Sequence, residues 1–143
     1  MIALPDVNVL MALTWSNHPH HEQAHRWFAQ SAADGWATCL LTQTGFLRLS
    51  LNLQVVGVSI DCAAALSLLT SLVAHPDHRY LEAAATVTAG PFVDVAPRIA
   101  GYRQVTDATL LHLARIHGAK LVTFDQPVAG ICPWGENVET LTS

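Results

Sequence analysis

The stretch VTDATLLHLARIHGAKLVTFD, residues 105–125, holds the pattern that decides the fold. Its apolar spacing predicts a helix over residues 107–117, with Thr106 as the N-cap. Residues 120–124, KLVTF, then predict a strand. A helix that leads directly into an apolar strand is typical of α/β layer proteins. The strand is followed at once by an acidic residue, Asp125.

Outward from this stretch, the chain keeps alternating between strand and helix patterns. Further strands are predicted over residues 2–4, 36–41, 78–82 and 138–141, and further helices over residues 7–15, 20–33, 43–53 and 60–74. Thr42 and Ser59 are the expected N-caps of the last two helices, and residues 83–101 give no clear pattern. The 143 residues contain no repeat or linker. We therefore expect a single α/β domain over residues 1–143 with a mainly parallel central sheet.

The composition is that of a globular chain with few charges. Hydrophobic residues make up 51% of the chain and charged residues 13%, against a usual charged share of about 25%. So low a charge indicates that a partner covers part of the surface. The formal net charge of −4 at pH 7 argues against a protein that coats DNA non-specifically, because such a protein needs a basic stripe. It does not argue against a nuclease, which can hold acids around a metal ion.

The cysteines and the hydropathy pattern indicate the compartment. Cys39, Cys62 and Cys132 are odd in number and form no CxxC pair, which favours a reducing environment over a disulfide framework. The first residues, MIALPDVNVL, lack the basic start and the cleavage site of a signal peptide. The uncharged residues 62–74 are too few to cross about 30 Å of hydrocarbon. We expect a cytoplasmic protein without a membrane segment.

Acidic residues stand at the ends of three predicted elements. Asp6 follows the first strand, Asp125 follows the strand of residues 120–124, and Asp107 opens the helix before that strand. Sites in open parallel α/β sheets form at the carboxyl ends of the strands, near a switch point. If these two strands are neighbours, the carboxylates converge and repel one another unless a cation lies between them. Oxygen ligands of this kind suit Mg²⁺ or Mn²⁺.

Several polar neighbours can support such a site. Asn8, Thr106 and Thr123 can orient a ligand or a water molecule, and Arg48 can hold a phosphate group. Each of these features also has an ordinary structural alternative. The acids can serve as an N-cap, as a partner of a helix dipole and as a turn residue, and Arg48 can form a surface ion pair.

The segment His21-Glu22-Gln23-Ala24-His25 matches the HExxH pattern of zinc peptidases. On a helix, His21 and His25 can bind Zn²⁺ while Glu22 acts as the base. The match is short, no GxxH continuation follows it, and the surrounding residues form an ordinary amphipathic surface. The structural alternative is a half-exposed helix with solvated histidines, and we favour that alternative.

The segments LPDVNVLMAL, HPHHEQAHRW, TQTGFLRL and VTDATLLHLARIHGAKLVTFD together resemble the VapC toxins, which are PIN-domain ribonucleases of bacterial toxin–antitoxin pairs. The resemblance implies a three-layer α/β/α sandwich and Mg²⁺- or Mn²⁺-dependent endoribonuclease activity. It also implies inhibition by a VapB-type antitoxin. Asp6, Asp107 and Asp125 match the metal-binding acids of the family, and Asn8 matches the polar residue beside the first acid.

One position departs from the family pattern. Many VapC proteins carry a glutamate at the start of the third helix, where this chain has Gly45. The site then holds three acids instead of four, with Gln43 or a water molecule as a stand-in. We expect a metal-dependent endoribonuclease toxin, with a catalytically weak PIN-fold module that binds RNA or antitoxin as the alternative. The apolar surface of residues 60–74, together with the helix predicted over residues 20–33, is expected to bind the antitoxin or a second copy in a homodimer.

Overall fold

A parallel sheet of five strands lies in the middle of the computed structural model, which describes residues 1–83 and 85–142. The strands are ordered β3-β2-β1-β4-β5, and every neighbouring pair is parallel. Their bounds are Ile2–Pro5 for β1, Trp36–Thr38 for β2, His78–Tyr80 for β3, Ala119–Thr123 for β4 and Val138–Thr140 for β5.

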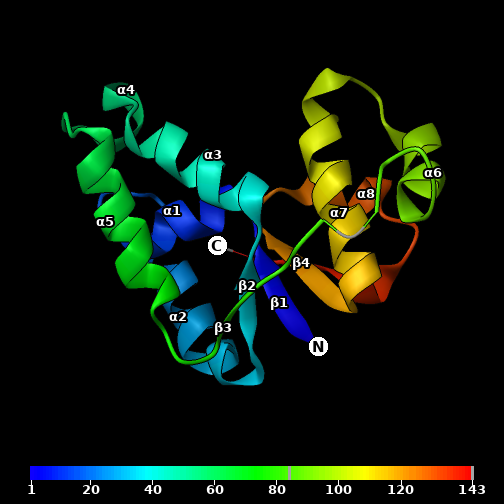
Figure 1. Cartoon of the computed structure of the whole chain (residues 1–143), viewed down its shortest axis with the longest axis horizontal. Helices are drawn as coiled ribbons and strands as arrows, with labels where there is room; N and C mark the ends of the chain where they lie inside the picture. The colour runs from blue at the N-terminus through cyan, green and yellow to red at the C-terminus, as the bar shows by residue number, and fades with distance from the viewer. Residues whose placement is uncertain (84, 143) are drawn as a thin grey trace.

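Helices cover both faces of the sheet (Figure 1). One face carries α1 (Val7–Thr14), α2 (His21–Ser31), α3 (Leu40–Ser50), α4 (Leu53–Val56) and α5 (Cys62–Val73). The other carries α6 (Pro91–Val95), α7 (Val105–His117) and α8 (Gln126–Ile131). Short 3₁₀ helices connect some of these elements: η1 (Ala32–Asp34), η2 (Ala96–Arg98), η3 (Tyr102–Gln104) and η4 (Gly135–Asn137).

Side chains alternate along each strand between two cores, because successive residues of a strand point to opposite faces. In β1, Ala3 belongs to the core under α1, α2, α3 and α5, and Leu4 belongs to the core under α6, α7 and α8. In β4, Val122 belongs to the same core as Ala3, and Leu121 belongs to the same core as Leu4. The predicted three-layer α/β/α sandwich is therefore confirmed.

The order of the strands reverses between β1 and β4. The chain builds β2 and β3 on one side of β1, and then crosses over to place β4 and β5 on the other side. Pro5 of β1 pairs with Val122 of β4, and the Asp6 amide donates to the Val122 carbonyl at 2.9 Å. The carboxyl ends of β1 and β4 therefore lie side by side at a switch point, where ligands bind in folds of this class.

The start of α3 differs from its prediction. The strand expected over residues 36–41 ends at Thr38, and α3 begins at Leu40 with Cys39 as the N-cap. Thr42 is the third helical residue and not the cap. Its hydroxyl accepts a hydrogen bond from the Cys39 amide at 3.0 Å, which is one half of a capping box.

Two other N-caps were also predicted wrongly. The cap of α5 is Asp61 and not Ser59, because the Asp61 carboxylate accepts a hydrogen bond from the Ala64 amide at 2.8 Å. Helix α7 begins at Val105, so Thr106 lies inside its first turn.

In the part of the chain that the structure describes, no helix has the length and apolarity needed to cross a bilayer.

Candidate active site at the switch point

The three acids lie around two adjoining hollows at the switch point. Asp6 and Asp107 line the first hollow, of about 230 Å³. Asp125 lines the second, of about 310 Å³. Asn8 lines both hollows, so the two spaces meet at its side chain. Residues far apart in the sequence are thus brought to one edge of the sheet.

Asp6 is buried and held at both carboxylate oxygens. Its Oδ1 accepts a hydrogen bond from the Val9 amide at 3.1 Å, so Asp6 is also the N-cap of α1. Its Oδ2 accepts a hydrogen bond from the Thr123 hydroxyl at 2.5 Å. The Thr123 Oγ1 in turn accepts a hydrogen bond from the Asp125 amide at 3.0 Å. Thr123 thus connects the turn that carries Asp125 to the carboxylate of Asp6.

The acids carry the electrostatic signs of crowding. Burial raises the pKa of Asp6 above its usual range, although hydrogen bonds from Thr123 and from backbone amides oppose this rise. Burial, together with the charges of Asp6 and Asp125, raises the pKa of Asp107 to about 6. Burial is thus the main cause of both shifts, and the charges of neighbouring acids add to it at Asp107, as in carboxylates that share a site.

No basic side chain neutralises these acids within the described residues. The ion pairs found there join Arg115 to Glu136 and Lys120 to Glu139. Arg48 is exposed on α3 and lines the hollow of Asp6 and Asp107 without forming an ion pair. It lies where it can contact an anion that enters the hollow. Thr106 lines the same hollow from the first turn of α7.

The donor set fits a hydrated divalent cation. Within residues 1–83 and 85–142, no three His, Cys, Asp or Glu side chains are grouped closely enough to hold an ion among themselves. Mg²⁺ does not require such a cage, because it commonly keeps several waters and binds one or two carboxylates together with substrate phosphate oxygens. Uncompensated carboxylates around an open hollow suit an ion bound in this way.

Gly45 is required by the packing of α3 against α1. A Cβ atom added at Gly45 would lie 2.6 Å from Val7 Cγ2, closer than real Cβ atoms approach their neighbours. An acidic side chain cannot be placed there unless Val7 moves. The Gln43 amide donates to the Thr38 hydroxyl at 3.0 Å, so it is engaged at the end of β2. Neither position supplies a fourth carboxylate.

The histidines of the HExxH match bind helix α1. His21 Nδ1 lies 2.7 Å from the Ala12 carbonyl, and His25 Nε2 lies 2.8 Å from the Leu13 carbonyl. These carbonyls belong to the last turn of α1, whose oxygens have no partner inside the helix. The half-exposed helix is confirmed, since His21 is partly exposed and His25 is exposed. In addition, each ring contacts a carbonyl of α1 and so joins α2 to α1. No third metal ligand accompanies them among the described residues.

Sequence reasoning missed the aromatic border of the second hollow. His18, Pro19, His20 and Phe124 line this hollow beside Asp125. The His20 ring stacks on the Phe124 ring, with centroids 4.5 Å apart and planes 19° apart. The only sequence signal is the adjacency of Phe124 to Asp125, because the contact with His20 spans more than a hundred residues and forms only in the folded chain.

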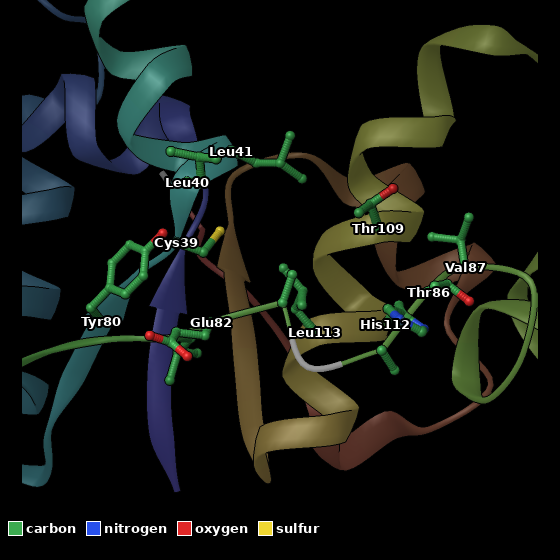
Figure 2. A pocket seen from close by; sticks show the side chains of 13 residues that line it. Cys39, Leu40, Leu41, Tyr80, Glu82, Thr86, Val87, Thr109, His112 and Leu113 are labelled. Carbon is green, nitrogen blue, oxygen red and sulfur yellow. The ribbon is translucent and has the colours of Figure 1, made fainter.

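A larger cavity, of about 530 Å³, lies on another side of α7 (Figure 2). Thr109, His112 and Leu113 of α7 line it and face the start of α3, whereas Asp107 of the same helix lines the acidic hollow. The cavity is mostly apolar, and Glu82 is the one acid among the described residues of its wall. Carboxylates and a guanidinium, which can bind a cation and an anion, line the smaller acidic hollow instead, so that hollow is the better candidate site.

The fold agrees with the comparison to known families. The family described as PIN domain matches residues 3–129, which is most of the chain. The parallel α/β/α sandwich and the family match together identify the class of protein. The chain belongs to the PIN-domain family.

Relatives from Mycobacterium tuberculosis narrow this assignment. Ribonuclease VapC38 is 47% identical over 127 residues, which cover 89% of this chain and 87% of the relative. Ribonuclease VapC39 is 40% identical over 129 residues, with 90% and 92% covered, and Ribonuclease VapC44 is 37% identical over 129 residues, with 90% and 89% covered. Within the PIN domains, the chain is thus one of the VapC proteins, and the resemblance seen in the sequence is confirmed.

Proposed function

We propose that this protein is a metal-dependent endoribonuclease toxin that hydrolyses RNA phosphodiester bonds. The observation that carries the proposal is that Asp6, Asp107 and Asp125 line two adjoining hollows at the switch point, and that none of them forms an ion pair within the described residues. The names of the relatives support the reaction, since VapC38, VapC39 and VapC44 are each called ribonucleases. A phosphodiester bound through a metal ion suits the negative charge of the three acids and their place at the carboxyl ends of β1 and β4.

The acids would hold Mg²⁺ or Mn²⁺ in this proposal. Such an ion, when bound, supplies water activation and stabilises the charge that develops on the phosphate. Thr123 fixes the carboxylate of Asp6 through its hydroxyl, and Asn8, between the two hollows, orients ligand or water. Arg48 contacts a phosphate oxygen. Because water attacks in place of the 2′-hydroxyl, the expected products carry 3′-hydroxyl and 5′-phosphate ends.

The test is cleavage of total RNA by the purified chain with Mg²⁺, with Mn²⁺ and with a chelator. Asp6→Asn and Asp107→Asn should each lower the rate by about 100-fold or more, since even the residues that only support metal ligands contribute 10- to 100-fold. Glu22→Gln is the matched control, because Glu22 is an exposed acid of α2 outside the site. Glu22→Gln should keep full ribonuclease activity. Glu22 would be essential only if the HExxH segment were a zinc peptidase site, where it acts as the base.

The packing of Gly45 favours one alternative function. The family glutamate expected at this position has no room beside Val7, so metal affinity can fall too low for turnover. The chain would then be a catalytically weak PIN-fold module that binds RNA or antitoxin. Absence of cleavage under every metal condition, with Asp6→Asn behaving like the wild type in cells, would establish this alternative and reject the nuclease.

We also propose a VapB-type antitoxin and a second copy of the chain as partners. Leu66 and Leu68 of α5 are 52% and 37% exposed, which is costly for apolar side chains unless a partner covers them. The three free cysteines suit the reducing cytoplasm. Leu66→Lys should weaken antitoxin capture or shift the sedimentation of the chain toward the monomer. A variant that changes neither would remove α5 as the contact surface.

A further inference from the structure

A stacked pair of aromatic rings borders the candidate site next to Asp125. His20 lies just before α2, and Phe124 lies between β4 and Asp125. Their rings are nearly parallel, at 19°, with centroids 4.5 Å apart. Phe124 is joined by a single peptide bond to Asp125, so the ring pair is held in a fixed position beside the acids.

The ring pair lines open space on the surface. The hollow of about 310 Å³ is bounded by both rings and by Asn8, His18, Pro19 and Asp125. The same rings also line a neighbouring hollow of about 320 Å³, together with Gln126, Leu141 and Thr142. Spaces of this size are at the lower end of small-ligand pockets, which begin at about 300 Å³. The hollow is thus large enough for one planar heterocycle.

Polar atoms in the wall add recognition groups to these flat surfaces. His18 Nδ1 accepts a hydrogen bond from the His20 amide at 3.0 Å, which orients the His18 ring. His20 Nδ1 is buried and has no hydrogen-bond partner among residues 1–83 and 85–142. A buried polar atom left unpaired costs free energy. Because this atom is covered, the Nε2 atoms of His18 and His20, which form no hydrogen bond among the described residues, are the ring nitrogens left for a ligand.

The charge of the wall decides which part of a nucleic acid fits. Asp125 lines the hollow, and no lysine or arginine does, so a phosphate group would be repelled in the part of the hollow that a bound metal ion does not neutralise. A neutral base is not repelled, and every base has a face that can stack on an aromatic ring. Arg48 lies at the first hollow, where a phosphate is better placed. A strand that crosses the acids can therefore contact both hollows.

We propose that the hollow of His18, His20 and Phe124 binds one nucleobase of single-stranded RNA, adjacent to the phosphate that is cleaved. The inference rests on the proposed ribonuclease function and deepens it by placing a base-binding subsite on the Asp125 side of the acids. Phe124 and His20 supply the stacking surface, and the edge of the base meets the Nε2 atoms of His18 and His20. These residues would then set a preference for the base that flanks the cut.

Binding without cleavage gives the direct test. Fluorescence anisotropy in chelator compares short oligoribonucleotides of A, C, G or U with an abasic ribose-phosphate oligomer of equal length and charge. The wild type should bind at least one base-bearing oligomer about five-fold or more tightly than the abasic one, as expected for one stacked base. Equal affinity for base-bearing and abasic oligomers would overturn the subsite.

Variants then locate the effect. Phe124→Leu and His20→Leu remove the flat rings but keep apolar volume, and each should abolish the difference between base-bearing and abasic oligomers. Tyr80→Leu is the matched control, because Tyr80 is a 47% exposed aromatic residue that lines the cavity on another side of α7. It should keep the difference. If both ring variants melt at the wild-type temperature and still prefer base-bearing RNA, the proposal is wrong.

Cleavage of total RNA is scored separately, so that the two proposals can fail independently. Base-dependent binding without cleavage in Mg²⁺ or Mn²⁺ would overturn the nuclease and leave the subsite supported. Cleavage with an unchanged base preference at the cut in both ring variants would overturn the subsite and leave the nuclease supported. Should Phe124→Leu fail to fold, His20→Leu and the wild-type comparison still decide the outcome.

Discussion

Asp6 shows how one side chain can serve the fold and the site together. Its Oδ1 caps α1, which is the structural alternative considered for this residue, while its Oδ2 accepts a hydrogen bond from Thr123 at the switch point. Asp107 lies in the first turn of α7, where a negative charge favours the helix dipole, and it also lines the acidic hollow. The structural and functional interpretations of these acids therefore do not exclude one another.

Asp107 should make the metal-free protein less stable as the pH rises. Its pKa is raised from 3.8 to about 6 in the folded chain, so the folded state binds the proton more tightly than the unfolded state. The stabilisation from that proton is present below about pH 4 and is lost as the pH rises through about 6. Asp107→Asn lacks this loss. In chelator at pH 7, the free energy of unfolding of Asp107→Asn should therefore be about 1 kcal/mol higher than that of the wild type. This is less than the full effect of the pKa shift, because Asp107 is partly exposed.

Urea unfolding in chelator, followed at two pH values, measures the effect. The stability difference between Asp107→Asn and the wild type should be present at pH 7 and should shrink toward about pH 4, where both side chains are neutral. A difference that stays constant between these pH values would show that the substitution acts through packing and not through the charge.

At the scale of elements, the pairing of α1 with α3 shapes the site as much as the acids do. Gly45 lets α3 approach Val7 of α1 closely, and this contact positions Arg48 one turn further along α3. The sequence comparison with VapC proteins identified the glycine as a missing acid. The packing shows a second reason for the glycine, namely that a Cβ atom at this position would collide with Val7 unless Val7 moves.

Gly45→Ala should therefore destabilise the fold. Overpacking of this kind costs about 1–3 kcal/mol, and the better helix propensity of alanine returns at most about 1 kcal/mol of it. Gly45→Glu should be at least as destabilising and should not increase nuclease activity. Thermal unfolding of both variants measures the change.

Gly130→Ala is the matched control for this prediction. Gly130 lies in helix α8, and no described atom of another part of the fold lies within 4 Å of an added Cβ. Its substitution should leave the stability unchanged or raise it slightly. If Gly45→Ala proves as harmless as Gly130→Ala, then Val7 yields easily and the site can accept a side chain.

The sequence predicted the type of most elements but not where several of them begin. Helix α3 begins before Thr42 because Cys39 and Thr42 form a capping box, and α5 begins after Asp61 because that carboxylate caps it. Both are local choices between polar residues that stand a few positions apart. Helix α8 was not predicted, because Asp125 was considered as the residue of a turn over residues 125–127, although Pro127 also fits the first turn of a helix.

At the scale of the whole molecule, the site depends on the order of the strands. The sequence predicted acids at the ends of the first strand and of KLVTF, and it made their meeting conditional on these strands being neighbours. The pairing of β1 with β4 meets that condition. The hollow of His20 and Phe124 was not predictable, because its two rings come together only through the tertiary contact of α2 with the end of β4.

Divalent metal should stabilise the folded chain as a whole. An ion that binds only the folded state adds about 2.7 kcal/mol at a concentration 100 times its dissociation constant, and it also relieves the repulsion among the acids. The melting temperature should thus rise with added Mg²⁺ or Mn²⁺ and fall again with chelator. Asp6→Asn should abolish the rise, and Glu22→Gln should keep it. A rise of equal size in Asp6→Asn would place the ion elsewhere.

The pairing of β1 with β4 also has a consequence for synthesis of the protein. Thr123, which donates to Asp6, and the neighbouring Asp125 are synthesised more than a hundred residues after Asp6. A nascent polypeptide that has not yet extended β4 lacks half of the proposed centre. Under the proposed function, the growing chain would therefore gain nuclease activity only once β4 has been made and has paired with β1.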